Sequence, residues 1–240
     1  MGDFLDVLLD NRSDVLDGLW TTIQATVYGA ALALVLSFAL GLSALHRLLL
    51  VRGLSRTVVE FFRGTSLYIQ LFWLYYAMPQ LLGYELDPLF CGVVAFGLNY
   101  GAYGSEVVRG AVNAVPRAQR EAAVALNMTP LQQMRRVVLP QAWVQMIPPF
   151  ANLLIQLVKC TPLLWLISVA DLMTVMEGLR KRTGDTVEAY LTLLVMYFVL
   201  AAALTFLMNA LERSAAARLG RRPGTGSLLR SRSTTKAGVA

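Results

Sequence analysis

The sequence is poor in the residues that build catalytic and metal centres. It has one histidine and two cysteines among 240 residues. His46 lies at the end of an apolar run, and Cys91 and Cys160 both lie inside apolar runs. This pattern indicates neither a disulfide framework nor a metal site. No set of metal ligands and no pair of a catalytic nucleophile with a histidine base is recognisable, so an intramembrane enzyme is not indicated.

Charged residues are also scarce, at 15% of the chain. Long stretches carry no charge at all, namely 18–45, 64–84, 88–105, 137–158 and 189–211. A helix needs about 20 apolar residues to cross about 30 Å of hydrocarbon, and lipid offers backbone groups no partner outside the helix. The sequence therefore predicts an all-α integral membrane protein with five transmembrane helices, near 18–45, 57–82, 88–113, 147–175 and 187–212.

Basic residues concentrate on alternate connections between these predicted spans. Of the 21 lysines and arginines, three lie in 46–56, five in 109–143 and seven after residue 211. The opposite connections are rich in aspartate and glutamate, with the basic triplet 180–182 as an exception. The positive-inside rule then places the N-terminus outside and the C-terminus in the cytoplasm of a multi-pass protein. No basic face accompanies aromatic stacking residues, so we expect membrane lipid and no nucleic acid as a partner.

The chain reads as one membrane domain with short flanks. Residues 1–17 are predicted to lie at the outer interface, and 18–213 to form the transmembrane domain. Residues 214–240, rich in Arg, Ser, Gly and Thr, are predicted to be a disordered cytoplasmic tail near anionic headgroups. No sequence of the type G-x-x-x-x-G-K-[ST] occurs, so the chain itself is not expected to bind ATP through a P-loop.

The cytoplasmic segment 114–140 has the signals of an ordered helical hairpin. Residues 121–126 favour a helix, and Asn127 tolerates the left-handed conformation that closes one. Thr129 and Gln132 fit a capping box with Pro130 at the first helical position. The second helix is predicted to stop before Pro140. We expect a compact elbow suited to docking on another protein, with an ordinary hairpin on the membrane surface as the alternative.

The elbow also carries a recognisable motif. Its residues are Glu121, Ala122, Ala123, Asn127, Leu139 and Pro140, with Val137 two positions before Leu139. This pattern resembles the EAA loop of ABC importer permeases, in which glycine is usual where Asn127 stands. Three more segments are similar to the polar amino acid uptake permeases: 61–65 with 70–72, 98–103 with Glu106 and 109–110, and 147–149 with Asn152 and Lys159.

The resemblance implies a type I ABC importer permease of the MetI-like fold, in the inner or cytoplasmic membrane of a bacterium. It implies a second permease subunit, a dimer of cytoplasmic ATPases that carry the ATP and magnesium, and an extracytoplasmic solute-binding protein. The elbow would couple the chain to the ATPases, and no catalytic residue, cofactor or metal is expected here. The solute would be a polar amino acid or a compatible solute such as ectoine. A secondary transporter or channel remains the alternative, but it does not account for the elbow.

Two stripes mark the third predicted span. Gly97, Gly101 and Gly104 share a face that permits close helix packing. Asn99, Tyr103 and Glu106 form a polar stripe. Polar groups at membrane depth face a cavity or a neighbouring helix, so Asn99 and Tyr103 line a solute path or make hydrogen bonds between helices. Glu106 lies near the cytoplasmic end, where we expect an interfacial role or a pair with Arg109.

The fourth predicted span carries a lysine near the membrane centre. Relatives often read Lys-Asp-Thr-Ser where this chain has Lys159, Cys160, Thr161 and Pro162. Lys159, Cys160 and Thr161 are predicted to belong to the solute path, with Lys159 meeting a carboxylate. Because Cys160 cannot replace the missing carboxylate, we expect a zwitterion or carboxylate without a cationic side chain. The alternative is that Lys159 pairs with an acidic group on a neighbouring helix.

Overall fold

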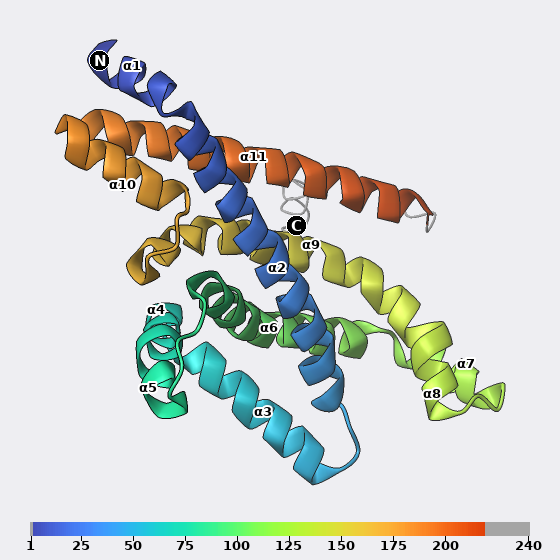
Figure 1. Ribbon diagram of the computed structural model, residues 1–240. Helices are drawn as coiled ribbons and strands as arrows, with labels where there is room; N and C mark the ends of the chain where they lie inside the picture. The colour runs from blue at the N-terminus through green and yellow to red at the C-terminus, as the bar shows by residue number, and fades with distance from the viewer. Residues whose placement is uncertain (1, 219–240) are drawn as a thin grey trace, which may run out of the picture.

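The computed structural model describes residues 2–218, and every regular element in that range is helical. Figure 1 shows the arrangement, in which α2 crosses the molecule and packs along α6. The elements in chain order are α1 (Gly2–Asp10), α2 (Arg12–Ser43), α3 (Leu49–Gly64), α4 (Leu67–Phe72), a π turn (Trp73–Ala77), α5 (Met78–Leu82), α6 (Pro88–Ala114), α7 (Arg117–Ala125), α8 (Pro130–Gln133), a second π turn (Met134–Val138), α9 (Leu139–Cys160), a 3₁₀ helix (Thr161–Ile167), α10 (Leu172–Thr183) and α11 (Thr186–Arg218).

Three helical stretches of the described chain are long and apolar enough to cross a membrane. They are Arg12–Ser43, the continuous Pro130–Ile167 and Thr186–Glu212. The third predicted span coincides with α6, which has 27 residues but carries many glycine, tyrosine and asparagine residues that lower its hydropathy. Three of the five predicted spans therefore overlap a helix that is both long and apolar enough to cross a membrane. That the chain crosses the membrane five times remains a prediction.

Close packing of α2 on α6 depends on the predicted glycine stripe. A Cβ atom added to Gly97 or Gly101 would lie 2.4 Å from Leu32 or 2.8 Å from Leu36. At Gly104 it would lie 2.0 Å from the Ser37 Oγ. Since such distances are far inside van der Waals contact, the two backbones approach this closely only with glycine in α6.

The second predicted span is not one continuous helix, which corrects the prediction for 57–82. Helix α3 begins at Leu49 and ends at Gly64, and an extended step through Thr65 and Ser66 leads into α4. The Gln70 Nε2 donates to the Phe62 carbonyl at 2.8 Å and to the Thr65 Oγ1 at 2.7 Å. These bonds satisfy backbone and hydroxyl groups that have no partner where the helix is interrupted. Lipid could not provide such hydrogen bonds.

The fourth predicted span also differs from the prediction, at both ends. The helix that starts at Pro130 continues through Pro140 and does not stop before it. A π turn precedes Pro140, and there each N–H bonds to the carbonyl five residues earlier, as the Leu139 N–H does to the Met134 carbonyl. At the other end α9 stops at Cys160.

The stop at Cys160 follows from Pro162. Because Pro162 has no N–H for the Val158 carbonyl, that carbonyl accepts instead from the Thr161 N–H and, at 2.8 Å, from the Thr161 hydroxyl. Residues 172–175 belong to the separate helix α10, not to the span predicted for 147–175.

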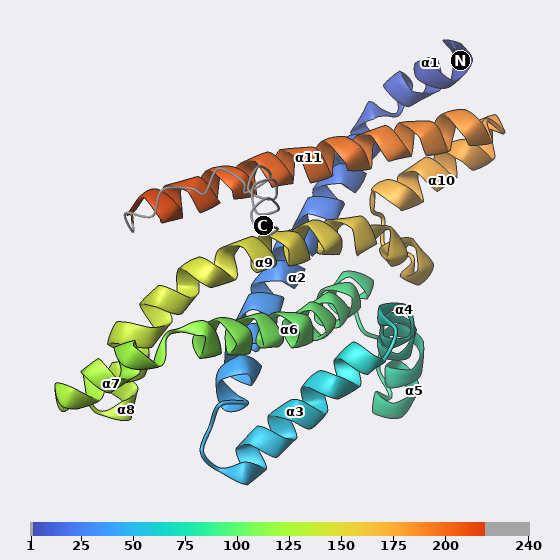
Figure 2. The same ribbon diagram turned by 180° about the vertical axis from the view of Figure 1, so that it is seen from behind.

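Figures 1 and 2 agree on the two ends of the molecule. Helices α1, α4, α5 and α10 lie at one end, and α7, α8 and the end of α11 lie at the other. Helix α11 continues to Arg218, so the first five residues of the predicted 214–240 tail are helical. The rest of that tail, from residue 219, lies outside the described residues.

Candidate functional site

The elbow closes as its sequence predicts. Asn127 has a φ of 50°, one of two positive values among the described non-glycine residues. Its N–H donates to the Val124 carbonyl at 2.9 Å, and the Met128 N–H donates to the Ala123 carbonyl at 3.1 Å. This pair of bonds is the Schellman pattern, which ends a helix by reversing the chain. The left-handed turn at Asn127 is therefore confirmed.

The second half of the elbow is capped on both sides. The Thr129 Oγ1 accepts from the Gln132 N–H at 3.4 Å, and the Gln132 Oε1 accepts from the Thr129 N–H at 2.9 Å. This is the predicted capping box. The Arg120 side chain donates to the Val112 carbonyl at the end of α6, which fixes α7 against the membrane domain. The elbow is thus a rigid extension of α6 and α9.

The residues of the elbow differ in how far their side chains are exposed to solvent. Ala123 is 2% exposed, whereas Glu121 and Ala122 are exposed and Leu139 is half-buried. Ala123 therefore packs within the elbow itself. Three exposed apolar side chains at the tip of the elbow were not predicted as functional: Val124, Leu126 and Leu131, at 59, 71 and 75% exposure. Their position beside a left-handed turn was the signal that could have identified them.

Asn99 lies inside the helix bundle. Its side chain is 6% exposed, and its Nδ2 donates to the Phe62 carbonyl at 3.0 Å and to the Gln70 Oε1 at 3.2 Å. Asn99 therefore makes hydrogen bonds between helices, which was the alternative to lining a solute path. Tyr103, one turn further along α6, is 40% exposed, and the Arg63 guanidinium lies 5.3 Å from its ring centroid.

The three predicted path residues at the end of α9 do not share one environment. Lys159 is exposed, so its ammonium group faces outward from this subunit. Cys160 is half-buried and receives a hydrogen bond from the Tyr100 hydroxyl at 3.2 Å. Thr161 is fully buried, with its hydroxyl 3.2 Å from that of Tyr197 on α11. Only Lys159 presents its side chain freely.

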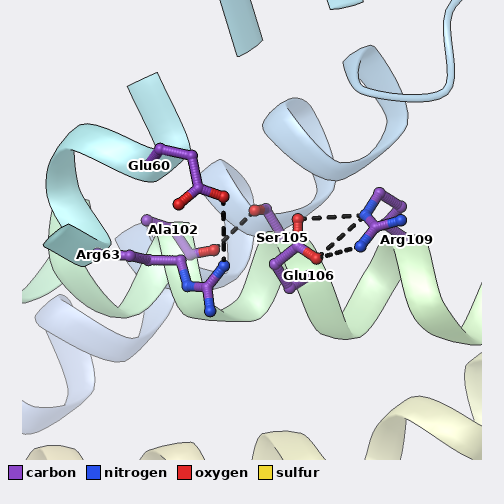
Figure 3. Close-up of polar contacts among 6 residues, drawn as sticks. All are labelled: Glu60, Arg63, Ala102, Ser105, Glu106 and Arg109. Carbon is purple, nitrogen blue, oxygen red and sulfur yellow. Dashed lines mark hydrogen bonds and ion pairs between the residues drawn. The ribbon is translucent and has the colours of Figure 1, made fainter. Parts of the chain in front are cut away.

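Two ion pairs lie near each other on α3 and α6; the expected pair of Glu106 with Arg109 is confirmed, whereas the pair of Glu60 with Arg63 was not predicted. Figure 3 shows Glu60 and Arg63 of α3 directed toward the part of α6 that carries Glu106 and Arg109. The Arg63 Nη1 is 3.7 Å from the Glu60 Oε1, whereas the Arg109 Nε is 3.1 Å from the Glu106 Oε2. The resemblance included Arg63, Glu106 and Arg109 but not Glu60, although its position three residues before Arg63 was a local signal for an ion pair on a helix.

The loop between the 3₁₀ helix and α10 carries a second unpredicted set of groups, outside the membrane-spanning segments. Asp171 is fully buried, and its Oδ1 caps α10 by accepting from the Thr174 N–H at 2.9 Å. Its Oδ2 is buried without a partner. Burial raises the pKa of the Asp171 carboxyl to about 6. The carboxyl is therefore poised to titrate in the mildly acidic range.

Helix α10 also explains how the basic triplet 180–182 is tolerated. The Arg180 Nε donates to the Glu177 Oε2 at 2.9 Å, and the Lys181 Nζ is 3.8 Å from the Glu177 Oε1. The hydrogen bond from Arg180 lowers the pKa of Glu177. Part of the positive charge that opposes the predicted orientation is thus balanced locally.

Comparison with known proteins points in one direction. Residues 33–217 match the family described as binding-protein-dependent transport system inner membrane component. The chain is 45% identical over 202 residues to a probable amino-acid ABC transporter permease protein, y4tF, of Sinorhizobium fredii, covering 82% of this chain and 85% of that one. It is 34% identical over 199 residues to the arginine transport system permease protein ArtQ of Bacillus subtilis, covering 83% and 91%.

Solved structures show the same fold. An amino acid ABC transporter crystallised with histidines superposes with a TM-score of 0.81 at 26% identity, covering 88% of this chain and 98% of that one. The MetNI methionine ABC transporter, in an inward-facing conformation, superposes with a TM-score of 0.73 at 20% identity, covering 86% and 98%. The second likeness concerns the fold alone.

Proposed function

Because this chain belongs to the family of binding-protein-dependent transport system inner membrane components, a family of ABC importer permeases, we propose that its path carries a polar amino acid or a related small zwitterion. The chain is a transport subunit and not an enzyme. ATP hydrolysis belongs to a separate partner. The observation that carries the importer role is the rigid elbow at one end of the molecule, since a solute path alone has no need of it. An amino acid as the solute is supported by the names of the similar permeases.

The elbow is proposed to dock on a cytoplasmic ATPase. Its exposed apolar tip, formed by Val124, Leu126 and Leu131, provides a compact contact surface. Glu121, Ala122, Ala123, Asn127, Leu139 and Pro140 remain the proposed coupling element, with Ala123 and Asn127 acting by shaping the elbow. Because Arg120 ties α7 to α6, movement of a docked ATPase would reach the membrane helices directly. ATPase binding at this end also fits the proposed orientation, with the N-terminus outside and the end of α11 in the cytoplasm.

The partners follow from the same model of function. A second permease subunit, identical or paralogous, would complete the solute path, and a solute-binding protein would deliver the solute from the opposite side. The exposed apolar side chains along α11 support a lipid or protein neighbour in a bacterial cell membrane, among them Leu194, Phe198, Phe206 and Leu207.

Lys159 is proposed to meet the carboxylate of the solute. It lies just before the seven-residue 3₁₀ helix, which is about 14 Å long at about 2 Å per residue. That length supports a position for Lys159 near the middle of a bilayer core of about 30 Å. No acidic side chain is within 4 Å of its ammonium group among the ion pairs of the described residues. The pairing alternative thus has no support within this subunit.

The decisive experiment is affinity purification of the chain from its native membrane in mild detergent. A co-purifying ATPase, with uptake in proteoliposomes that requires ATP, is the expected result. Uptake that proceeds without ATP and responds instead to an ion gradient would favour a secondary transporter and overturn the proposal.

A further inference from the structure

Four leucines at the start of α3 are exposed in a part of the chain that is predicted to lie outside the hydrocarbon core. They are Leu48, Leu49, Leu50 and Leu54, here called the leucine patch, and Leu50 is 86% exposed. Residues 46–56 form the first predicted cytoplasmic connection, where water would surround these side chains. Single exposed leucines are common, but a contiguous group marks a contact with a partner or a membrane.

The leucine patch faces away from the rest of the subunit. The buried residues of α3 are Ser55 and Val59. Leu50 and Leu54 are one turn apart and share a face that lies about 140° around the helix from the buried one. They remain exposed because no element of the described chain covers this face. Whatever covers the leucine patch therefore comes from outside the subunit.

Two observations place the leucine patch beside the membrane surface. The Ser55 hydroxyl donates to the Leu40 carbonyl at 2.7 Å, and Leu40 lies in the last turn of α2. Helix α2 is long and apolar enough to cross a membrane, and a short loop joins its end to α3 in Figures 1 and 2. Leu48 is five residues beyond Ser43, where α2 ends, so the two lie within about 18 Å of each other. The hydrogen bond and the short loop keep the patch at the level of the lipid headgroups.

Basic side chains accompany the leucine patch, and no acidic residue does. Arg47, Arg52 and Arg56 lie in the same connection, and residues 46–56 include no aspartate or glutamate. None of the three arginines forms an ion pair in the described chain, and Arg47 and Arg56 are exposed. Guanidinium groups bind phosphate oxygens through paired hydrogen bonds. Unpaired arginines beside exposed leucines fit a molecule with an anionic phosphate head and an apolar tail.

We propose that residues 47–56 bind anionic phospholipids of the adjacent leaflet, with Arg47, Arg52 and Arg56 donating to headgroup phosphates and the leucine patch inserted among the acyl chains. A free phosphate would occupy the arginines but leave the leucines in water. The lipid contact anchors the connection between α2 and α3 to one membrane surface. It is independent of the transported solute, and so of the proposed function.

The test measures lipid binding to the delipidated full-length chain in detergent by native mass spectrometry. Phosphatidylglycerol is compared with phosphatidylcholine of the same chain length. The anionic lipid is expected to bind at least tenfold more tightly, because each arginine near an anionic surface contributes about fivefold. Equal binding of the two lipids would overturn the proposal.

A headgroup without acyl chains separates lipid from a soluble anion. Glycerophosphoglycerol carries the phosphate of phosphatidylglycerol but has no apolar part. It is expected to bind at least tenfold more weakly than the lipid, because the leucine patch gains nothing from it. Binding as tight as that of phosphatidylglycerol would assign the arginines to a soluble anion and overturn the proposal.

The arginines are tested by a triple variant with a control of equal charge. Arg47→Gln, Arg52→Gln, Arg56→Gln is expected to weaken binding of phosphatidylglycerol at least tenfold and to leave that of phosphatidylcholine nearly unchanged. The control removes three positive charges from α10, which lies away from the start of α3 in Figures 1 and 2, and should bind both lipids as wild type does: Arg180→Gln, Lys181→Gln, Arg182→Gln. Equal losses in the two triple variants would show that only net charge matters, and would overturn the proposal.

The leucine patch is tested separately. Leu50→Gln, Leu54→Gln is expected to weaken binding of both lipids at least fivefold, because two apolar side chains no longer enter the lipid. Unchanged binding would overturn the proposal.

A crosslinking experiment identifies what covers the patch in the complete permease–ATPase complex. A photoreactive amino acid replaces Leu50, and the complex is illuminated in liposomes that contain phosphatidylglycerol. Crosslinks to lipid are expected. Crosslinks mainly to a second permease subunit or to the ATPase would show that protein covers the leucine patch, and would overturn the proposal.

Discussion

The Nδ2 of Asn99 donates a 3.0 Å hydrogen bond to the carbonyl oxygen of Phe62, and so joins the middle of α6 to the last turn of α3. Had α3 continued as a helix, the N–H of residue 66 would have occupied that carbonyl. The break at Thr65 thus makes the Asn99 contact possible, and the contact in turn stabilises the break.

Replacement of Asn99 is therefore expected to lower stability. Asn99→Leu leaves the Phe62 carbonyl with one partner fewer and the Gln70 Oε1 without its donor, at a cost of about 1–3 kcal/mol for buried polar groups. The melting temperature of the detergent-purified protein measures this loss. Thr205→Val is the control, because the Thr205 hydroxyl donates within its own helix to the Ala201 carbonyl. Equal melting temperatures for Asn99→Leu and wild type would contradict the role assigned to Asn99.

Ala123→Asp is expected to leave membrane insertion intact and to abolish transport. Since Ala123 is buried in the elbow, a carboxylate there lacks a partner and costs several kcal/mol, which distorts the surface offered to the ATPase. Co-purification of the ATPase and ATP-dependent uptake are the measurements. Ala118→Asp on the exposed first turn of α7 is the control, and it should retain both. Normal uptake by Ala123→Asp would argue decisively against coupling through the elbow.

The left-handed turn at Asn127 gives a graded prediction. Asn127→Gly should be nearly silent, because glycine adopts a φ of 50° without strain. Asn127→Val should reduce coupled ATPase activity and uptake, since a β-branched residue resists this conformation at a cost of about 1–2 kcal/mol. The two variants are compared in the same reconstituted complex. Equal activities for the valine and glycine variants would show that the turn conformation is unimportant.

Asp171 predicts a dependence of stability on pH. Its pKa rises from an ordinary 3.8 to about 6 in the folded protein, so the folded state holds more protons between these values. The free energy of unfolding therefore falls as pH rises from about 4 to about 6 and remains lower above that, by up to about 3 kcal/mol.

The variant Asp171→Asn tests this pH dependence. Its neutral amide keeps an oxygen for the Thr174 N–H, so the variant should melt at a higher temperature than wild type at pH 7.5. The difference should shrink toward pH 5, as the wild-type carboxyl becomes protonated. Melting curves across that range provide the measurement, and a difference independent of pH would refute the assignment to Asp171.

Lys159→Met tests the solute contact at the end of α9. Uptake is expected to fall at least tenfold while the binding protein still captures solute, because the loss of one charged contact is worth about 1.5–3 kcal/mol. Lys181→Met, which alters an exposed lysine on α10, should retain uptake. Unchanged transport kinetics in Lys159→Met would rule out a contact between Lys159 and the solute.

Several features of the structure could be predicted from local sequence signals alone. The turn at Asn127, the capping box of Thr129 and Gln132 and the close packing at Gly97, Gly101 and Gly104 all depend on residues near one another in the chain or on one helix face. The uncharged runs identified the helices α2, α6 and α11 to within a few residues at most ends, because their hydrophobicity is continuous.

The interruptions in the other two predicted spans were decided by tertiary contacts. Nothing local requires α3 to stop at Gly64. It stops because Gln70 and Asn99 satisfy the groups that the break exposes. The passage of the helix through Pro140 depends on a π turn, which propensity does not predict. The sequence determined that this chain is a helical membrane protein with an elbow, since periodicity and caps are local properties, and its motifs identified the permease family. Only the tertiary structure decided that Asn99 is buried, that Ala123 faces inward and that Leu50 and Leu54 remain exposed, because burial and partnership depend on residues brought together from distant helices.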